Sequence, residues 1–504
     1  MLSLADALRL ATERSEQIEV AAAGVDRARG RVLQARSGFL PEVTASASYT
    51  RTFASEFDDI GAFGPDGDGG PGGGDGEAPD GEATEGFGDL PFGRENAWNL
   101  GLTVTQILYA GGRVRAQTHI AEANRDVADL EVLQSRAQAL HDAAQAYFDV
   151  QLAAAVVDIA SSGVALARTT LDQARVGYEV GAQPEFDVLR AQVEVDNRAM
   201  DLVVARRQLE LAELRLHQVV EIPVGVPLVL TTRLEIDADP TGPAVALADI
   251  PPDMGVEERA VVRQSDLAVD IAEAGVRVAR SQWLPTVAAT VNAGLVAYPD
   301  GILPPLDPGE WRENLTAGVS LQLPLFTGFR IRGEVISAQA DLRESEALRE
   351  QTEELADLDT ATILADLASA EATLEATSGT VAVAGRAYEI ARIRYEQGVG
   401  SQFELSDALL QLQQARANRA QALRDLLLAR VRIALLPVLP LQTGAASAAA
   451  AATSQEAERE FRTGAAAAPG GAAAQGSGGG VRSIGIREAG AGGFGGTAPT
   501  GTGR

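Results

Sequence analysis

The feature that most constrains the fold of this 504-residue chain is an internal duplication. Residues 174–190 read ARVGYEVGAQPEFDVLR and residues 391–407 read ARIRYEQGVGSQFELSD, so six identities recur 217 positions later. The same offset aligns GLTVTQILYAGGRVR at 101–115 with GVSLQLPLFTGFRIR at 318–332. Because a fixed period marks a repeated structural unit, both copies should contain the same elements in the same order.

A second pair of segments sets the boundaries of the two copies. QARSGFLPEV at 34–43 matches VARSQWLPTV at 278–287 with an offset of 244, so the first copy holds 27 extra residues between positions 43 and 101. The pattern predicts a first repeat over 1–221, a connector over 222–252 with one short strand, and a second repeat over 253–437. An Ala/Gly-rich tail, 438–504, is expected to be disordered.

Each repeat predicts a helix followed by two strands. The helices cover about 3–37 and about 254–282, and each ends at a Leu-Pro step, since proline cannot continue a helix. Alternating residues then predict strands near 43–50 and 100–107 in the first copy, and over 287–296 and 315–323 in the second. Strands of about ten residues are long enough to cross a bilayer when tilted.

A very long helix follows the second strand of each repeat. Proline-free heptad patterns run over about 113–178 and about 330–395, which at 1.5 Å per residue gives roughly 100 Å of coiled coil. Tight turns at Gly181 and Gly398 reverse the chain, and returning helices reach about Val219 and Leu435. The fold class is therefore mainly α, a tandem repeat of helix, strand, strand, long helix, turn and helix.

The four predicted strands bear on the question of a membrane. No stretch of about 18 uninterrupted apolar residues predicts a membrane-spanning helix, and the first residues do not resemble a signal peptide. Four strands are too few for a spanning barrel, which needs about eight, and lipid does not tolerate open sheet edges. If the strands span a membrane, several copies of the chain must therefore combine them.

The segments LADAL at 4–8, QARSGFLP, QILYAGGR and the paired ARxxYExG resemble the TolC-type outer-membrane efflux protein family through about residues 2–437. The resemblance implies a homotrimer with a twelve-stranded barrel in outer-membrane lipid and a long α-helical tunnel in the periplasm. It also implies passive exit of substrates, by efflux or type I secretion. The implied partners are a periplasmic adaptor (membrane fusion protein) and an inner-membrane transporter.

Composition and the lack of certain motifs argue against several other functions. A net charge of −28 disfavours nucleic acid as a partner, and the absence of cysteine removes thiol chemistry. Three histidines at wide spacing suggest no metal site, and no nucleotide loop or nucleophile motif indicates an enzyme or a cofactor. The alternative is a soluble or periplasmic coiled-coil scaffold or adaptor, which would not require the paired strands.

The insertion at 58–95 is rich in glycine and acids, and predicts a disordered loop between two strands. A calcium-binding Asp/Gly loop, in the run DGDGGPGGGDGE, is the sharper alternative. The resemblance implies an extracellular position for this loop.

The resemblance also implies where the tunnel is narrowest, at the periplasmic tip where carboxylates project inward. The matching positions are Glu404 and Asp407, which share a helix face because they lie three residues apart. In the first repeat Asp187 matches Glu404, whereas Arg190 matches Asp407. Acids at a helix start can also simply complement the helix dipole, and that alternative remains open.

Three further residues near the turns are candidates for gate contacts. Arg190 could form an ion pair with Asp407 or Glu404 across helices. Tyr178 and Tyr395, at matching repeat positions, are expected either to pack in the helical seam or to donate a gating hydrogen bond.

Overall fold

The first repeat follows the predicted order, with one additional break. In this computed structural model, the described residues are 1–53, 95–181, 183–226, 228–231, 234, 240–251, 254–256 and 258–441. The elements of the first repeat are α1 (Leu4–Arg14), α2 (Glu16–Ser37), β1 (Glu42–Arg51), β2 (Asn96–Ala110), α3 (Arg113–Glu179) and α4 (Glu185–Val219). Most of the acidic insertion, and the tail beyond residue 441, lie outside the described residues.

The second repeat repeats this order after a short helix, α5 (Thr241–Ala248). Its elements are α6 (Ala260–Ser281), β3 (Thr286–Ala297), the 3₁₀ turn η3 (Pro308–Glu310), β4 (Arg312–Gln322), α7 (Arg330–Glu396) and α8 (Gln402–Leu435). Both long helices have 67 residues and begin and end 217 positions apart. The predicted fold class, mainly helical with a repeated helix–strand pattern, is confirmed.

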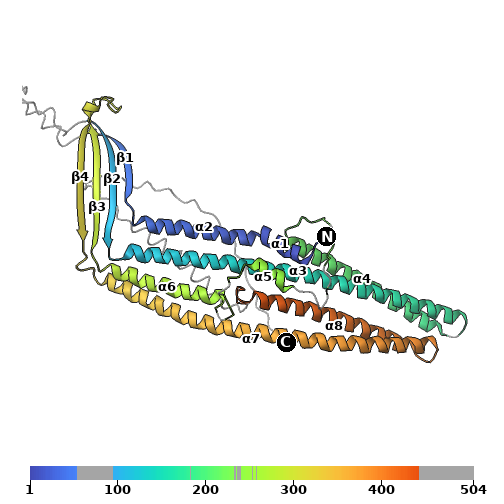
Figure 1. The fold of residues 1–504 in the computed structure, drawn as a ribbon. Helices are drawn as coiled ribbons and strands as arrows, with labels where there is room; N and C mark the ends of the chain where they lie inside the picture. The colour runs from blue at the N-terminus through green and yellow to red at the C-terminus, as the bar shows by residue number, and fades with distance from the viewer. Residues whose placement is uncertain are drawn as a thin grey trace, which may run out of the picture. The chain divides into compact units, whose positions relative to one another are not determined.

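The four strands form one antiparallel sheet in the order β1-β2-β3-β4. The two repeats join through β2 and β3, where Leu100 lies opposite Leu295 and Thr103 opposite Asn292. In Figure 1 the sheet lies at one end of the helices and the two helical hairpin turns lie at the other end. Helix α3 packs along α4 and α7 along α8, while α2 and α6 run beside α3 and α7.

The start of the chain differs from the single helix that the pattern predicts over 3–37. The helix breaks at Ser15, and the side chain of Arg14 and the backbone N–H of Glu16 both bind Glu221, at 3.2 Å each. The break lets Leu4 and Leu8 of α1 enter the core, where they are almost fully buried. These contacts join residues 205 and 207 positions apart, so local periodicity could not predict them.

Among the connector residues that the structure describes there is a helix, α5, and no regular strand. One parallel bridge joins Leu2 to Leu230 there, and Leu2 N–H donates to Val229 O at 2.8 Å. Tyr147 of α3 donates its hydroxyl to Leu2 O at 3.1 Å. These contacts fix the beginning of the chain against the connector and α3.

The last described residues belong to the core of the second repeat. Val438 and Leu439, which the composition assigns to the tail, are buried, and Pro437 O accepts a hydrogen bond of 2.8 Å from Ala260 N–H. The first helix of this repeat, α6, begins at Ala260, six residues later than the predicted start near 254. The folded unit therefore extends beyond α8.

One helix, α3, contains an 18-residue window that could cross a membrane by length and composition alone. This differs from the expectation drawn from uninterrupted apolar runs, because the window tolerates scattered charges among many alanines. The same helix forms a long antiparallel contact with α4 and contributes Leu140 and Tyr147 to the core. A single window of this kind is weak evidence for membrane insertion.

Candidate functional site: the hairpin tips and the sheet faces

The two helical hairpins reverse direction through the same backbone conformation. Gly181 and Gly398 have φ values of +73° and +72°, in the left-handed region that other residues adopt only at a cost. In each turn the glycine N–H donates to a tyrosine carbonyl three residues earlier, that of Tyr178 at 2.9 Å and that of Tyr395 at 3.0 Å. Both predicted repeat turns therefore lie at glycines that the conformation requires.

Glu404 lies in the first turn of α8, where Ser401 caps the helix. The Ser401 hydroxyl accepts from the Glu404 N–H at 3.2 Å, and the Glu404 carboxylate lies 3.5 Å from the Arg394 guanidinium of α7. Asp407 is exposed one turn further along α8. Among the described residues, no cation lies within ion-pair distance of Asp407. Arg394 therefore offsets part of the negative charge of this pair, and it was not among the residues predicted from the sequence.

Arg190 contacts an aromatic ring rather than a carboxylate. Its guanidinium carbon lies 5.2 Å from the centre of the Phe403 ring, so α4 and α8 meet through a cation–π contact. The expected ion pair of Arg190 with Glu404 or Asp407 does not form within the described part of the chain.

A buried glutamine makes the second contact between the two tips. With its amide oriented to match donor with acceptor, Gln402 of α8 donates to Asp187 O and accepts from Ala191 N–H, both at 3.0 Å. Gln402 is 4% exposed, so these hydrogen bonds are shielded from water. Asp187 therefore joins the tip through its backbone, while its side chain is half-buried. The repeat places Glu185 at the position of Gln402, so the duplication gave no signal for this contact.

The two tyrosines at matching repeat positions have different environments. Tyr395 is 5% exposed and packs against Ala391 and Leu405, whereas Tyr178 is 49% exposed. Burial raises the pKa of Tyr395; Gln183 lowers it and the charge of Asp187 raises it further. No hydrogen bond of normal geometry reaches the Tyr395 hydroxyl in the described structure, although the Gln183 side chain lies close to it. The geometry thus fits seam packing for Tyr395 and leaves Tyr178 accessible.

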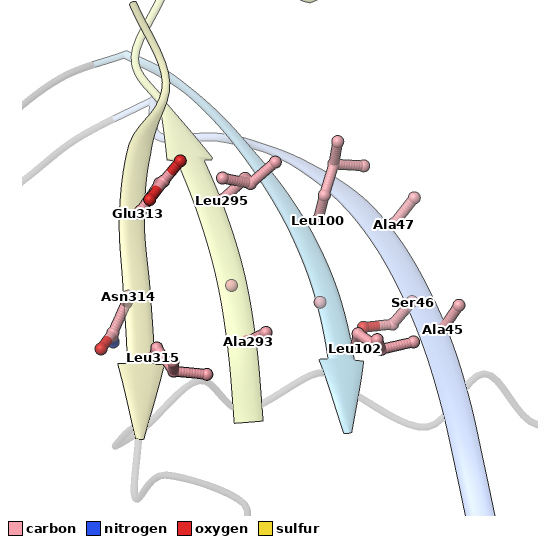
Figure 2. Close-up of a pocket in the computed structure, with 12 residues that line it drawn as sticks. Ala45, Ser46, Ala47, Leu100, Leu102, Ala293, Leu295, Glu313, Asn314 and Leu315 are labelled. Atoms are coloured by element: carbon pink, nitrogen blue, oxygen red, sulfur yellow. The ribbon is translucent and has the colours of Figure 1, made fainter. Parts of the chain in front are cut away.

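The sheet has one apolar face. Residues opposite one another in an antiparallel sheet share a face, so the register defines continuous rows across all four strands. Two such rows are Val43–Val104–Val291–Ala317 and Ala45–Leu102–Ala293–Leu315. Figure 2 shows Leu102, Ala45, Ala293 and Leu315 together on the sheet, with Leu100 and Leu295 one row further on.

The opposite face is mainly polar or carries no side chain. Its rows include Thr44–Thr103–Asn292–Thr316 and Ser46–Gly101–Gly294–Asn314. Thr103 donates to Asn292 Oδ1 at 3.0 Å within the first of these rows. A sheet with one apolar face and one polar face is typical of strands that separate lipid from a water-filled interior.

Aromatic residues flank the apolar face at both ends of the strands. At the end near the 3₁₀ turn, Tyr49 packs on Trp98 with ring centres 5.3 Å apart, and Trp311 follows η3. At the end near the helices, the exposed aromatic residues are Phe39, Tyr109, Trp283, Phe326 and Phe329. The chain has three tryptophans, and all lie at strand ends. Aromatic girdles of this kind mark the two interfaces of membrane-spanning barrels.

No metal site is evident in the part of the chain that the structure describes, which contains no group of three or more His, Asp or Glu side chains placed to hold an ion.

Several curated proteins and solved structures are similar to this chain. It is 25% identical to the probable efflux pump outer membrane protein TtgC of Pseudomonas putida over 234 residues, which cover 46% of each chain. The match thus spans about half the length of that relative. Nodulation protein T of Rhizobium leguminosarum bv. viciae is 24% identical over 344 residues, covering 67% of this chain and 69% of the relative.

The structural matches cover more of the chain. The outer membrane protein VceC of Vibrio cholerae superimposes with a TM-score of 0.66 at 20% identity, over 86% of this chain and 96% of VceC. The MtrE outer membrane channel of Neisseria gonorrhoeae gives a TM-score of 0.66 at 19% identity, over 87% and 89%. These likenesses show a shared fold.

A family model described as outer membrane efflux protein matches residues 7–220 and 253–436, which are the two repeats without the connector and the tail. With this match over most of its length, and with the fold of its structural neighbours, the chain belongs to the outer membrane efflux protein family.

Proposed function

We propose that three copies of this chain form a channel in the outer membrane, through which substrates leave passively by efflux or type I secretion. The observation that carries the proposal is a four-stranded sheet with one apolar face, one polar face and two open edges. Four strands cannot close a barrel, and three copies would supply twelve. The apolar faces would contact lipid and the polar faces would line the interior.

Substrates would reach the channel through a periplasmic adaptor and an inner-membrane transporter. The names of the relatives support this role, since TtgC of one Pseudomonas putida strain is described as a toluene efflux pump outer membrane protein and ArpC as an antibiotic efflux pump outer membrane protein. The paired long helices would form the tunnel that extends from the barrel into the periplasm.

The hairpin tips would form the constriction of this tunnel. Three copies of Glu404 and Asp407 would place six carboxylates around one opening, and rings of carboxylates favour cations over anions. Arg394 neutralises part of Glu404, so Asp407 would contribute more of the field. Asp187, held by Gln402 at the same tip, would add to the acidic rim.

Two measurements test the proposal. Native mass spectrometry in detergent should give the mass of three chains, and purified protein should form discrete, long-lived conductance steps in planar bilayers. A monomer that is stable without detergent and gives no conductance would contradict the channel and favour the coiled-coil scaffold. Such a scaffold has no physical reason to expose the apolar sheet face.

A further inference from the structure

The two edge strands of the sheet lack partners within the described chain. β1 pairs with β2 and β4 pairs with β3, so one side of each edge strand offers free backbone N–H and C=O groups. In lipid, unpaired backbone groups are strongly unfavourable, so these edges must be covered. A second copy of the chain is the partner that the proposed channel provides, and the inference below rests on that proposal.

We propose that β1 of one protomer pairs antiparallel with β4 of the next in a single register, which sets Glu42 opposite Gln322 and Arg51 opposite Glu313. The ion pair between Arg51 and Glu313 then fixes this register at the subunit boundary.

Strand length and face together select the register. β1 has ten residues and β4 has eleven, so only a few registers pair β1 over its whole length. In both strands the odd-numbered residues lie on the apolar face, because Ala45 shares a row with Leu315 through the two middle strands. A shift of one residue would set apolar side chains beside polar ones. The proposed register pairs every β1 residue and keeps odd opposite odd.

The side chains in this register are complementary on both faces. The apolar face gains pairs such as Val43 with Leu321 and Tyr49 with Leu315, and the polar face gains Ser48 with Thr316. Within β1 and β4 the apolar face carries two charged residues, Arg51 and Glu313, which have opposite signs and fall opposite each other. Opposite charges on directly facing residues stabilise strand pairs, whereas like charges destabilise them.

Arg51 lies on the edge strand β1 and remains partly exposed. Its guanidinium lies 3.5 Å from Glu95 Oε2 and 5.3 Å from the centre of the Phe53 ring, and its side chain remains 42% exposed. Glu313 is also exposed. Both charges lie at the end of the strands near the 3₁₀ turn, so neither would enter the middle of a bilayer.

The register also gives a reasonable barrel geometry. Across one sheet, Glu313 lies level with Leu295, Leu100 and Ala47, whereas the closing contact sets it against Arg51 of the next copy. Crossing the four strands of one copy therefore shifts the register from Ala47 to Arg51, which is four residues or about 13 Å along the strand. The four strand spacings crossed add up to about 19 Å. The corresponding strand tilt is about 35°, within the range of outer-membrane barrels.

Backbone direction identifies the best pair of positions for a cross-link. Thr52 N–H donates to Glu95 O at 2.8 Å, so even-numbered residues of β1 direct their backbone groups toward β2 and odd-numbered ones toward the open edge. Ser48 and Thr316 would then be a non-hydrogen-bonded pair across the boundary, with Cα atoms about 4.5 Å apart. That spacing permits a disulfide.

The first experiment uses the absence of native cysteine. The double variant S48C/T316C should form, on oxidation, several-fold more covalent trimer than S48C/N314C or S48C/G318C, which shift the register by two residues in either direction. More trimer from a shifted pair, or none from any pair in a protein that native mass spectrometry shows to be trimeric, would overturn the register. If the parent protein itself is not trimeric, the channel proposal fails and this inference fails with it.

The second experiment tests the ion pair. R51E and E313R should each lower the temperature at which the trimer dissociates in detergent by several degrees, and the double variant R51E/E313R should recover most of the loss. E95Q controls for the contact of Arg51 within its own chain, and should have a smaller effect. If the dissociation temperature of the double variant falls by the sum of the two single-variant decreases, the pairing of Arg51 with Glu313 is overturned.

Discussion

Arg259 and Asp359 form an ion pair of 2.9 Å in the interior of the second repeat, with side chains only 1% and 6% exposed. Arg259 also donates to Leu439 O at 3.2 Å and to Ala356 O at 3.3 Å. One guanidinium therefore joins the start of α6, the middle of α7 and the end of the folded chain.

Removing one partner of this pair should leave an uncompensated buried charge. We expect D359A to lose about 3–5 kcal/mol of stability, measured by thermal or denaturant unfolding in detergent. The control is D266A, whose carboxylate pairs with Arg349 on the surface and should cost about 1 kcal/mol or less. Equal losses in the two variants would show that the buried pair has no special role.

The constriction can be tested by removing its carboxylates. If Glu404 and Asp407 line the opening, E404A/D407A should raise single-channel conductance or lower cation selectivity, and weaken block by multivalent cations. The helix-dipole alternative predicts a loss of a few tenths of a kcal/mol per acid with unchanged conductance. The control in bilayer recordings is E210A, which removes an exposed acid from a different helix, α4.

Changing Arg394 should have the opposite effect on selectivity. R394Q frees the Glu404 carboxylate from its partner at 3.5 Å, so the opening should become more cation-selective. The change should also strengthen block by divalent cations. R392Q is a neighbouring control, because Arg392 pairs with Glu389 and Glu396 instead. Reversal potentials that do not move in R394Q would place Glu404 away from the ion path.

The buried hydroxyl of Tyr395 should contribute little to stability. Since no hydrogen bond of normal geometry reaches this hydroxyl in the described structure, Y395F should be neutral or stabilising by about 1 kcal/mol, whereas Y178F at the exposed position should change nothing. Burial raises the folded-state pKa of Tyr395, so the folded state holds its proton longer than the unfolded state. Stability should then fall as pH rises above about 10, and Y395F should reduce that loss. A steeper alkaline loss in Y395F would contradict this assignment.

Replacing a glycine by alanine should have opposite effects on stability at a turn and within a helix, because the backbone conformations differ. G398A should cost about 1–2 kcal/mol, because the added Cβ meets open space but the residue must keep a left-handed φ. G379A in the middle of α7 also meets open space, and should stabilise the helix by about 0.5–1 kcal/mol. Thermal unfolding of both variants checks the difference in sign.

The duplication made most of the element boundaries predictable from the sequence. The ends of α4 and α8 fall at Val219 and Leu435 as expected, because heptad periodicity and turn glycines are local signals. The break at Ser15 and the helix α5 were not predictable, since they depend on contacts with distant residues such as Glu221. The same holds at the tips, where Arg190 meets Phe403 and Gln402 binds the backbone of α4.

The way each repeat ends has a consequence for biosynthesis. Leu2 pairs with Val229 and Thr231 of the connector, and Ala260 pairs with Pro437, so the chain that follows the last helix of each repeat returns to the first residues of that repeat. Each half is a closed loop in which the ends meet, and neither loop can close until its final residues have left the ribosome. Truncating the chain before Pro437 should therefore trap the second half in an open state that proteases recognise, although the first half would already be complete.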